Sequence, residues 1–288
     1  MSRVIGFIAE KGGCTVESLL RSEGVSHRLL VRLKRTEMGI ARNGVHCRSC
    51  DITEEGDIIT ITLPEDKKTE KPNSGLYVPV VYEDEGIVIY NKSGNMPVHP
   101  SAGHRSDTLG NCFAANYPDL SFRPVNRLDR DTSGLCLCAK DAFSAEALQK
   151  TDIKKIYYCD AEGKINGSGA IDLPIVRERE SVIKRTVRED GKRAVTHYKA
   201  LCQNDYCTFL EVYLETGRTH QIRVHFSHLG HPLAGDDLYG GSRAHISRQA
   251  LHCRKMVFIH PLTHEKIEVT APLPADITRL IEGDKYEK

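Results

Sequence analysis

The sequence contains no tryptophan, and aromatic residues make up only 6% of its 288 residues. Neither sign of charge prevails, because 40 Lys and Arg side chains stand against 39 Asp and Glu. A net charge of +1 excludes a strongly basic surface overall, so any attraction for nucleic acid must come from local patches.

Long apolar runs are also missing. The stretch 4–9 is too short for a signal peptide, and Glu10 and Lys11 follow it directly. No other stretch approaches the length that a membrane-spanning helix needs. The ten cysteines are irregularly spaced and nothing signals secretion, so we expect no disulfide framework. These features predict a reduced cytoplasmic protein, and 288 residues leave room for a small domain and a large one.

The most informative stretch is 123–134, Arg-Pro-Val-Asn-Arg-Leu-Asp-Arg-Asp-Thr-Ser-Gly. Proline disfavours helix at the residue before it, so the segment should arrive extended. Side chains alternate in an extended chain, which places Arg127 and Asp129 on one face and Leu128 and Arg130 on the other. The Asp-Thr-Ser-Gly end supplies turn chemistry, and an apolar run follows as a buried strand. Taken alone, such a segment is an ordinary surface turn, so its surroundings decide its meaning.

Three further motifs follow in order: Lys-Lys-Ile-Tyr at 154–157, Leu-Glu-Thr-Gly-Arg-Thr-His-Gln-Ile-Arg at 214–223, and Gly-His-Pro-Leu-Ala-Gly-Asp at 230–236. The ordered set, within a likeness that runs from about Tyr82 to Pro274, resembles the RluA-type pseudouridine synthase family. The resemblance implies an enzyme that isomerises uridine to pseudouridine in structured RNA. It also implies an α+β fold with a mixed, largely antiparallel sheet, flanking helices and a central cleft.

The pattern of the catalytic region agrees with such a sheet. Leu210, Val212 and Leu214 alternate with more polar residues, which is typical of a strand with one buried face. Strands are predicted at 77–91, 135–140, 156–162, 195–201 and 208–215.

The resemblance also assigns roles to residues. Asp129 matches the catalytic aspartate, which acts at the sugar either as nucleophile or as base toward the 2′ carbon. Arg218 matches the basic partner that keeps this carboxylate ionised and oriented. Tyr157 matches the tyrosine that stacks on the target uracil, and Arg127 is implied in filling the gap when the base flips out. The isomerisation oxidises nothing and spends no phosphate, so we expect no cofactor and no metal.

Other candidates are less specific. Lys154, Lys155 and Arg223 are weaker candidates for phosphate contacts. Thr219 is predicted to cap a helix that begins beside Arg218. The buried stripe of that helix is predicted to be Ile222, Phe226 and Leu229.

Two positions depart from the family's pattern. Asn126 stands where the family usually has His, and Ser93 where it usually has Pro. Asn can keep one hydrogen bond of the His but cannot carry charge. This departure puts fine positioning or substrate choice in doubt, rather than the chemistry.

Residues 1–64 are predicted to form a small α+β RNA-binding domain. Thr15 and Ser26 should cap two short helices, the second at 27–35, and the pair Asn43-Gly44 should form a hairpin turn. The pattern resembles the RNA-binding module of ribosomal small-subunit protein four. The candidate phosphate contacts on its second helix are Arg28, Arg32 and Arg35.

The segment 65–76, rich in Lys, Glu, Pro and Ser, is predicted to be a flexible linker. It leads to a catalytic domain at 77–288. The module in front of that domain favours large-subunit ribosomal RNA as the target, with transfer RNA as the alternative. We expect RNA as the partner, no membrane, no small-molecule cofactor, and a monomer.

Three competing classes remain. A metal-dependent hydrolase could chelate zinc through closely spaced side chains, although no His-Glu-x-x-His order is present. Those side chains are His220, His225, His228, His231, Asp236 and Asp237. A glycosidase could pair Asp129 with Asp131, but Asp131 belongs to the turn. A non-catalytic RNA-binding or ribosome-assembly protein would tolerate Asp129→Asn.

Overall fold

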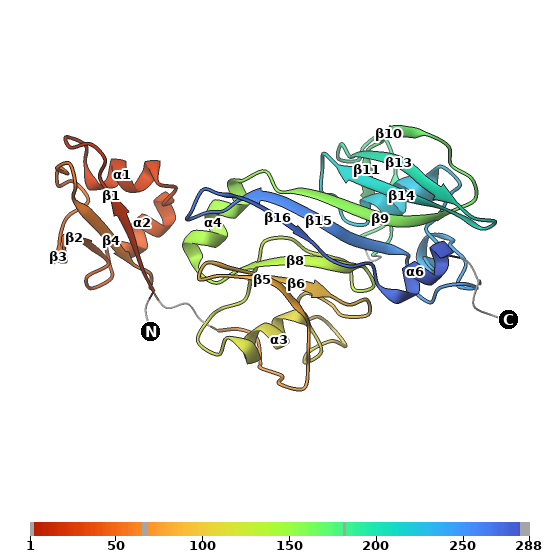
Figure 1. The fold of residues 1–288 in the computed structure, drawn as a ribbon, viewed down its shortest axis with the longest axis horizontal. Coiled ribbons are helices and arrows are strands. Elements are labelled where there is room, and N and C mark those ends of the chain that lie inside the picture. Colours follow the sequence, from red (N-terminus) through yellow and green to blue (C-terminus); the bar gives the residue numbers. More distant parts are fainter. Residues whose placement is uncertain (1–2, 65–67, 181–182, 283–288) are drawn as a thin grey trace.

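The computed structural model describes residues 3–64, 68–180 and 183–282. Its two main sheets lie in different parts of the chain, one before and one after residue 65 (Figure 1). No helix in these described ranges is long and apolar enough to cross a membrane.

The amino-terminal part packs two helices against a four-stranded antiparallel sheet of order β1-β4-β2-β3. Its elements are β1 (Val4–Ile8), α1 (Val16–Ser22), α2 (His27–Leu33), β2 (Ile40–Arg42), β3 (Val45–His46) and β4 (Ile58–Thr62). Thr15 and Ser26 each accept a backbone N–H of the helix that follows, as predicted. Asn43 and Gly44 have φ of 52° and 82°, which confirms the hairpin turn. Helix α2 ends at Leu33, so Arg35 lies beyond it, contrary to the predicted end at 35.

Part of the predicted linker is anchored. Asn73 donates from Nδ2 to the carbonyl oxygen of Ser106 at 2.7 Å, and Asn111 donates from Nδ2 to that of Lys71 at 2.7 Å. Residues 68–76 are therefore held against the start of α3 (Leu109–Asn116), rather than free as expected. The rest of that segment, 65–67, lies outside the described residues. The domain boundaries themselves stay a prediction.

The large sheet is mixed and mostly antiparallel, as predicted. Its order is β10-β13-β14-β9-β15-β8-β6-β5, with β16 paired to β15 and β7 to β8, and only β15 and β8 are paired in parallel among its described strands. Its strands are β5 (Val80–Glu83), β6 (Ile87–Lys92), β7 (Arg123–Pro124), β8 (Ser133–Ala139), β9 (Lys154–Glu162), β10 (Ser168–Asp172), β13 (Val195–Gln203), β14 (Cys207–Leu214), β15 (Leu251–Ile259) and β16 (Lys266–Thr270). The remaining elements are α4 (Ala142–Lys150), β11 (Ile175–Arg177), β12 (Arg185–Val187), α5 (Gln221–His228), the 3-10 turn η1 (Asp237–Tyr239) and α6 (Ala275–Glu282).

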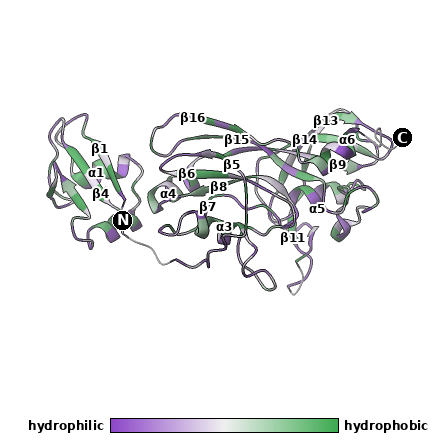
Figure 2. Cartoon of the chain, turned by 60° about the horizontal axis from the view of Figure 1, so that its bottom comes forward, coloured by the Kyte–Doolittle hydropathy of each residue, from purple (hydrophilic) through white to green (hydrophobic). Residues whose placement is uncertain are grey.

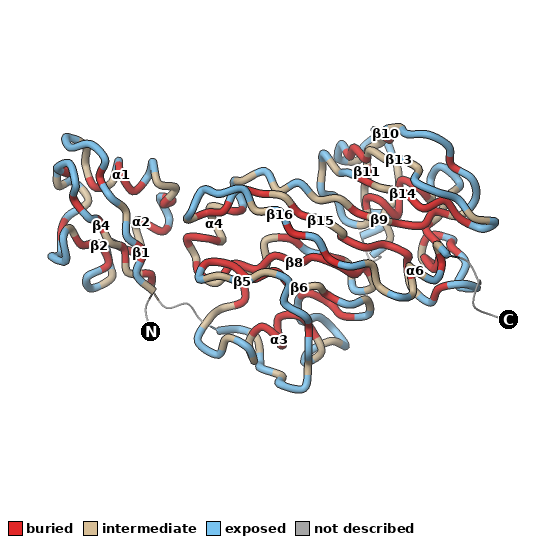
Figure 3. The backbone as a smooth tube through the Cα atoms, viewed as in Figure 1, coloured by how far each residue is buried: buried red, intermediate tan, exposed pale blue. Residues whose placement is uncertain are grey.

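The core follows the central strands. All seven residues of β8 are buried, because β15 and β6 flank it (Figure 3). These strands are largely hydrophobic, whereas many connecting loops are hydrophilic (Figure 2). The single strand predicted at 77–91 is instead the hairpin β5–β6, because Asp84 Oδ1 accepts the N–H groups of Gly86 and Ile87 in a turn.

Candidate active site

Asp129 lies in the loop between β7 and β8. The expected extended segment is short, because β7 covers only Arg123–Pro124, and burial alternates only from Asn126 to Asp129. Arg130 is exposed, contrary to the face it was predicted to share with Leu128. Leu128 is buried, Arg127 is exposed, and the side chain of Asp129 is 27% exposed. Both charged side chains line one cleft of about 790 Å³. Leu128 and Arg130 line the same cleft, so it does not separate the two predicted faces, and the shared face of Arg127 and Asp129 stays a prediction.

Two cations from distant segments hold this loop. The ammonium of Lys92, fully buried at the end of β6, donates to the carbonyl oxygens of Met96 at 2.8 Å and Arg130 at 2.9 Å. Arg248 donates from Nη1 to the carbonyl oxygen of Asp131 at 2.9 Å. Burial lowers the pKa of Lys92 to about 8. Sequence reasoning missed both residues, because the atoms that they hold in this loop are backbone carbonyls, which leave no mark in the side-chain pattern.

Gly134 lies where the loop ends and β8 begins to pair with β15. Its φ is 109°, and a Cβ built there would lie 2.3 Å from the carbonyl oxygen of Cys253. Only glycine lets β8 come this close to β15 with that backbone conformation. Because Cys253 is also opposite Tyr157 of β9, this approach brings Asp129 and Tyr157 to one site.

Asn126 connects the loop to the backbone of β8. Its Nδ2 donates to the carbonyl oxygen of Leu135 at 3.2 Å, and its Oδ1 accepts the N–H of Leu137 at 2.8 Å. Asn126 makes both bonds because a terminal amide carries a donor and an acceptor at once. Asn126 is buried and ties the loop to β8.

The partner of Asp129 is Arg223, in the first turn of α5. Arg223 donates from Nη1 to Asp129 Oδ2 at 2.9 Å. Its Nε and Nη2 hold both oxygens of the buried Asp236 at 2.7 Å. Although burial opposes the charged form, the bonds and charges of both carboxylates raise the pKa of Arg223 above its usual range. The guanidinium is therefore a fixed cation, and it is too buried for the phosphate contact considered for it.

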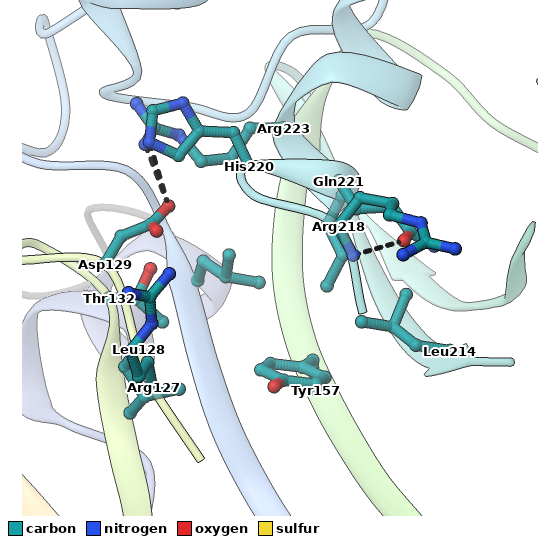
Figure 4. Close-up of a pocket in the computed structure, with 12 residues that line it drawn as sticks. Arg127, Leu128, Asp129, Thr132, Tyr157, Leu214, Arg218, His220, Gln221 and Arg223 are labelled. Atoms are coloured by element: carbon teal, nitrogen blue, oxygen red, sulfur yellow. Dashed lines mark hydrogen bonds and ion pairs between the residues drawn. The ribbon is translucent and has the colours of Figure 1, made fainter. Parts of the chain in front are cut away.

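The predicted pair between Asp129 and Arg218 is not formed. Arg218 donates from Nε to the carbonyl oxygen of Arg193 at 3.0 Å, and its guanidinium points away from Asp129 (Figure 4). The cause is His220, whose φ of 58° turns the chain just before α5. Thr219 is not the cap either, because the residue at the N-cap position is His220 and it makes no side-chain cap bond.

The predicted stripe of α5 is confirmed at Ile222 and Phe226, which are buried. Leu229 is 45% exposed, because the helix has already ended at His228.

His220 also faces Asp129. Its Nε2 lies 3.7 Å from Asp129 Oδ2, and its Nδ1 lies 2.8 Å from the hydroxyl of Tyr239. Because that hydroxyl already accepts the N–H of Arg185 at 2.9 Å, we assign its own hydrogen to His220 Nδ1. The hydrogen of the neutral imidazole is then on Nε2, directed at Asp129. Burial is the main cause that lowers the pKa of His220.

Tyr157 lies in the wall of the same cleft. It is only 7% exposed, and burial raises the pKa of its phenol well above the usual value, so the hydroxyl stays neutral. Its ring lies between the Asp129 side and the Arg218 side of the site (Figure 4). The structure thus brings Asp129, Arg127, Tyr157 and Arg218 to one cleft, although Arg218 has a different neighbour than predicted.

The histidines considered as zinc ligands have separate partners. His225 is engaged at both ring nitrogens, by the Thr196 hydroxyl and the Leu173 carbonyl, and His231 contacts the Glu162 carbonyl. Within the described ranges, no three His, Cys, Asp or Glu side chains are placed to share a metal ion.

Comparisons with known proteins agree with this geometry. The family model for RNA pseudouridylate synthase matches residues 86–228. The chain is 40% identical over 282 residues to an uncharacterized RNA pseudouridine synthase of Bacillus subtilis, covering 94% of this chain and all of that protein. The chain belongs to the RNA pseudouridine synthase family. It is therefore an isomerase that acts on RNA.

One named relative and one solved structure are also similar to this synthase. It is 37% identical over 264 residues to the ribosomal large subunit pseudouridine synthase D of Escherichia coli, covering 83% of this chain and 81% of that one. The solved structure of human RNA pseudouridylate synthase domain containing 1 superimposes with a TM-score of 0.59 at 26% identity, covering 70% of this chain and 86% of that one. The predicted pseudouridine synthase fold is confirmed.

Proposed function

We propose that Asp129 is the reacting carboxylate of this pseudouridine synthase and that the enzyme isomerises uridines in large-subunit ribosomal RNA. The proposal rests on the way in which Asp129 is bound and oriented. One oxygen is fixed by the buried Arg223, while the side chain remains 27% exposed to the cleft. An ionised, oriented and accessible carboxylate is what attack at a sugar requires.

The reaction exchanges one bond for another. The bond from uracil nitrogen-1 to the anomeric carbon breaks, the uracil turns without leaving, and its carbon-5 bonds to the same sugar carbon. Carbon-5 then loses a proton and nitrogen-1 gains one, so the atoms balance without an oxidant or a phosphate donor. Asp129 serves either as nucleophile at the anomeric carbon or as base at the 2′ carbon.

Two side chains prepare the uridine. Tyr157 offers a neutral aromatic ring within the cleft, which suits stacking on uracil. Arg127 is exposed at the cleft edge, so it can enter the stack when the target nucleotide flips out.

The amino-terminal part supplies a second RNA contact. Arg28 and Arg35 are exposed and Arg32 is half-buried. We assign the phosphate contacts to Arg28, Arg32 and Arg35, in a protein that works as a cytoplasmic monomer.

The similarity to the large-subunit synthase of Escherichia coli supports ribosomal RNA over transfer RNA as the target. The test maps pseudouridine in ribosomal and transfer RNA from cells with the gene, without it, and with Asp129→Asn. We expect specific large-subunit positions to lose pseudouridine in the last two strains. Loss at transfer RNA positions alone would overturn the choice of substrate. Modification that persists with Asp129→Asn would overturn the role of Asp129.

A further inference from the structure

A second hollow, of about 400 Å³, adjoins the uridine cleft. The loop of Gly217, Arg218 and Thr219 lines both spaces. The opposite wall comes from the hairpin of β11 and β12 and from the turn that follows it. We call this hollow the hairpin pocket and define it by its four cations, Arg177, Arg185, Lys192 and Arg218.

The charge of the hairpin pocket is strongly positive. Its one lining carboxylate among the described residues is Asp190, and Arg188 already holds both of its oxygens, at 2.5 and 2.9 Å. Within the described ranges, no carboxylate forms an ion pair with any of the four pocket cations. Like charges gathered without counter-charges repel one another, so the arrangement favours a bound anion.

Several guanidinium N–H donors of the pocket also lack an acceptor among the described residues. The Nε of Arg185 is buried and has no acceptor in the described part of the chain. A buried donor without a partner costs free energy unless a ligand satisfies it. Among the described residues, Arg218 donates only from Nε, to the Arg193 carbonyl, so its two terminal nitrogens remain for the pocket. The backbone of Arg185 is meanwhile held by the Tyr239 hydroxyl, which fixes β12 beside the site.

We infer that the hairpin pocket binds a phosphate of the RNA strand that flanks the target uridine. This inference rests on the proposed placement of that uridine at Asp129. The phosphates of a nucleotide are covalently tied to its sugar, and the pocket shares a wall with the cleft that receives the sugar. Guanidinium groups match phosphate oxygens in geometry as well as in charge. Arg218 then contributes to affinity and register, while Arg223 serves the reacting carboxylate.

The test uses the full chain and an unmodified large-subunit ribosomal RNA transcript. Arg177→Gln combined with Lys192→Gln removes two charges that line the hairpin pocket and do not line the uridine cleft. We expect RNA affinity to fall about tenfold or more. The slope of log Kd against log salt should become shallower by about one to two units, and kcat at saturating RNA should stay near that of the unaltered enzyme. Arg279→Gln, an exposed arginine of α6, is the matched control and should change neither quantity.

The outcomes separate the two proposals. A double variant with unchanged affinity and salt slope, in an enzyme that forms pseudouridine normally, would overturn the hairpin pocket alone. A fall in kcat at unchanged affinity would assign the two replaced cations to the chemistry and likewise overturn it. A protein that loses the salt-sensitive contacts as expected, yet forms pseudouridine with Asp129→Asn, would sink the proposed function and leave the pocket as an RNA contact.

Discussion

Arg223 joins two carboxylates, donating from Nη1 to Asp129 at 2.9 Å while Nε and Nη2 hold Asp236 at 2.7 Å. Asp236 is fully buried and binds two nitrogens of the guanidinium. The third nitrogen, Nη1, is left for Asp129. Orientation of Asp129 thus depends on a residue that does not face the cleft.

Replacing Arg223 by lysine should therefore cost both catalysis and stability. A single ammonium cannot bridge the two carboxylates, so we expect kcat to fall about a hundredfold or more. Weakening the partner of buried Asp236 should lower the free energy of unfolding by about 2 kcal/mol. Single-turnover assays and urea unfolding measure the two effects. Arg218→Lys is the control and should keep kcat within about twofold; the reverse ranking would restore Arg218 as the partner of Asp129.

Protonation of His220 should reduce the activity of the enzyme at low pH. Because burial lowers the pKa of His220, the ring is neutral at neutral pH and becomes charged only below its ordinary value of about 6.5. A charged ring would pair with Asp129 and compete with its reaction. The groups that face it are Asp129, Arg223, Asp236 and Arg185. We expect kcat/KM to fall as pH drops below this range.

Tyr239→Phe tests that assignment. The variant removes the hydrogen bond to neutral His220, so the pKa of His220 should rise and the acid limb should move to higher pH. The measurement is a pH profile of kcat/KM with the ribosomal RNA transcript. Tyr206→Phe, at an exposed tyrosine, is the control. An unmoved acid limb in Tyr239→Phe would show that another group sets it.

Gly134→Ala should destabilise the protein more than a strained backbone alone explains. The added Cβ meets both a positive φ and the carbonyl oxygen of Cys253. We expect a loss of at least about 3 kcal/mol in urea unfolding. Gly44→Ala is the control, because Gly44 has a φ of 82° but nothing within 4 Å of a new Cβ. It should cost about 1 kcal/mol; equal losses would mean that the close approach is unimportant.

Asp160→Asn should stabilise the enzyme at alkaline pH. Burial raises the pKa of Asp160 from 3.8 to about 7, and its Oδ2 has no partner among the described residues. A raised pKa contributes stability at low pH that is lost as pH rises from about 4 to 7. The asparagine removes this loss, which is on the order of 4 kcal/mol.

Urea unfolding at two pH values checks the prediction. The advantage of Asp160→Asn should be largest at about pH 8 and shrink by more than half near pH 5. Asp205→Asn, at an exposed carboxylate, is the control. An advantage independent of pH would show that the charge of Asp160 is not its source.

The sequence by itself determined the local features. Helix caps at Thr15 and Ser26 and the Asn43-Gly44 turn depend on neighbours within a few residues, so motif spacing predicts them. The ordered motifs also indicated the family and its chemistry. The hairpin at 77–91 was missed although Glu83-Asp84-Glu85-Gly86 separates two apolar runs, and Asp84 accepts the N–H groups that close the turn there.

Only the tertiary structure decided which cation serves Asp129. Arg218 and Arg223 lie in the same motif and carry the same group, so composition and spacing cannot choose between them. The left-handed backbone of His220 directs Arg218 toward the hairpin pocket, and the first turn of α5 then presents Arg223. Asp236 completes the set from beyond the helix. Contacts between residues that are 94 positions apart depend on strand order and helix phase, which no local pattern contains.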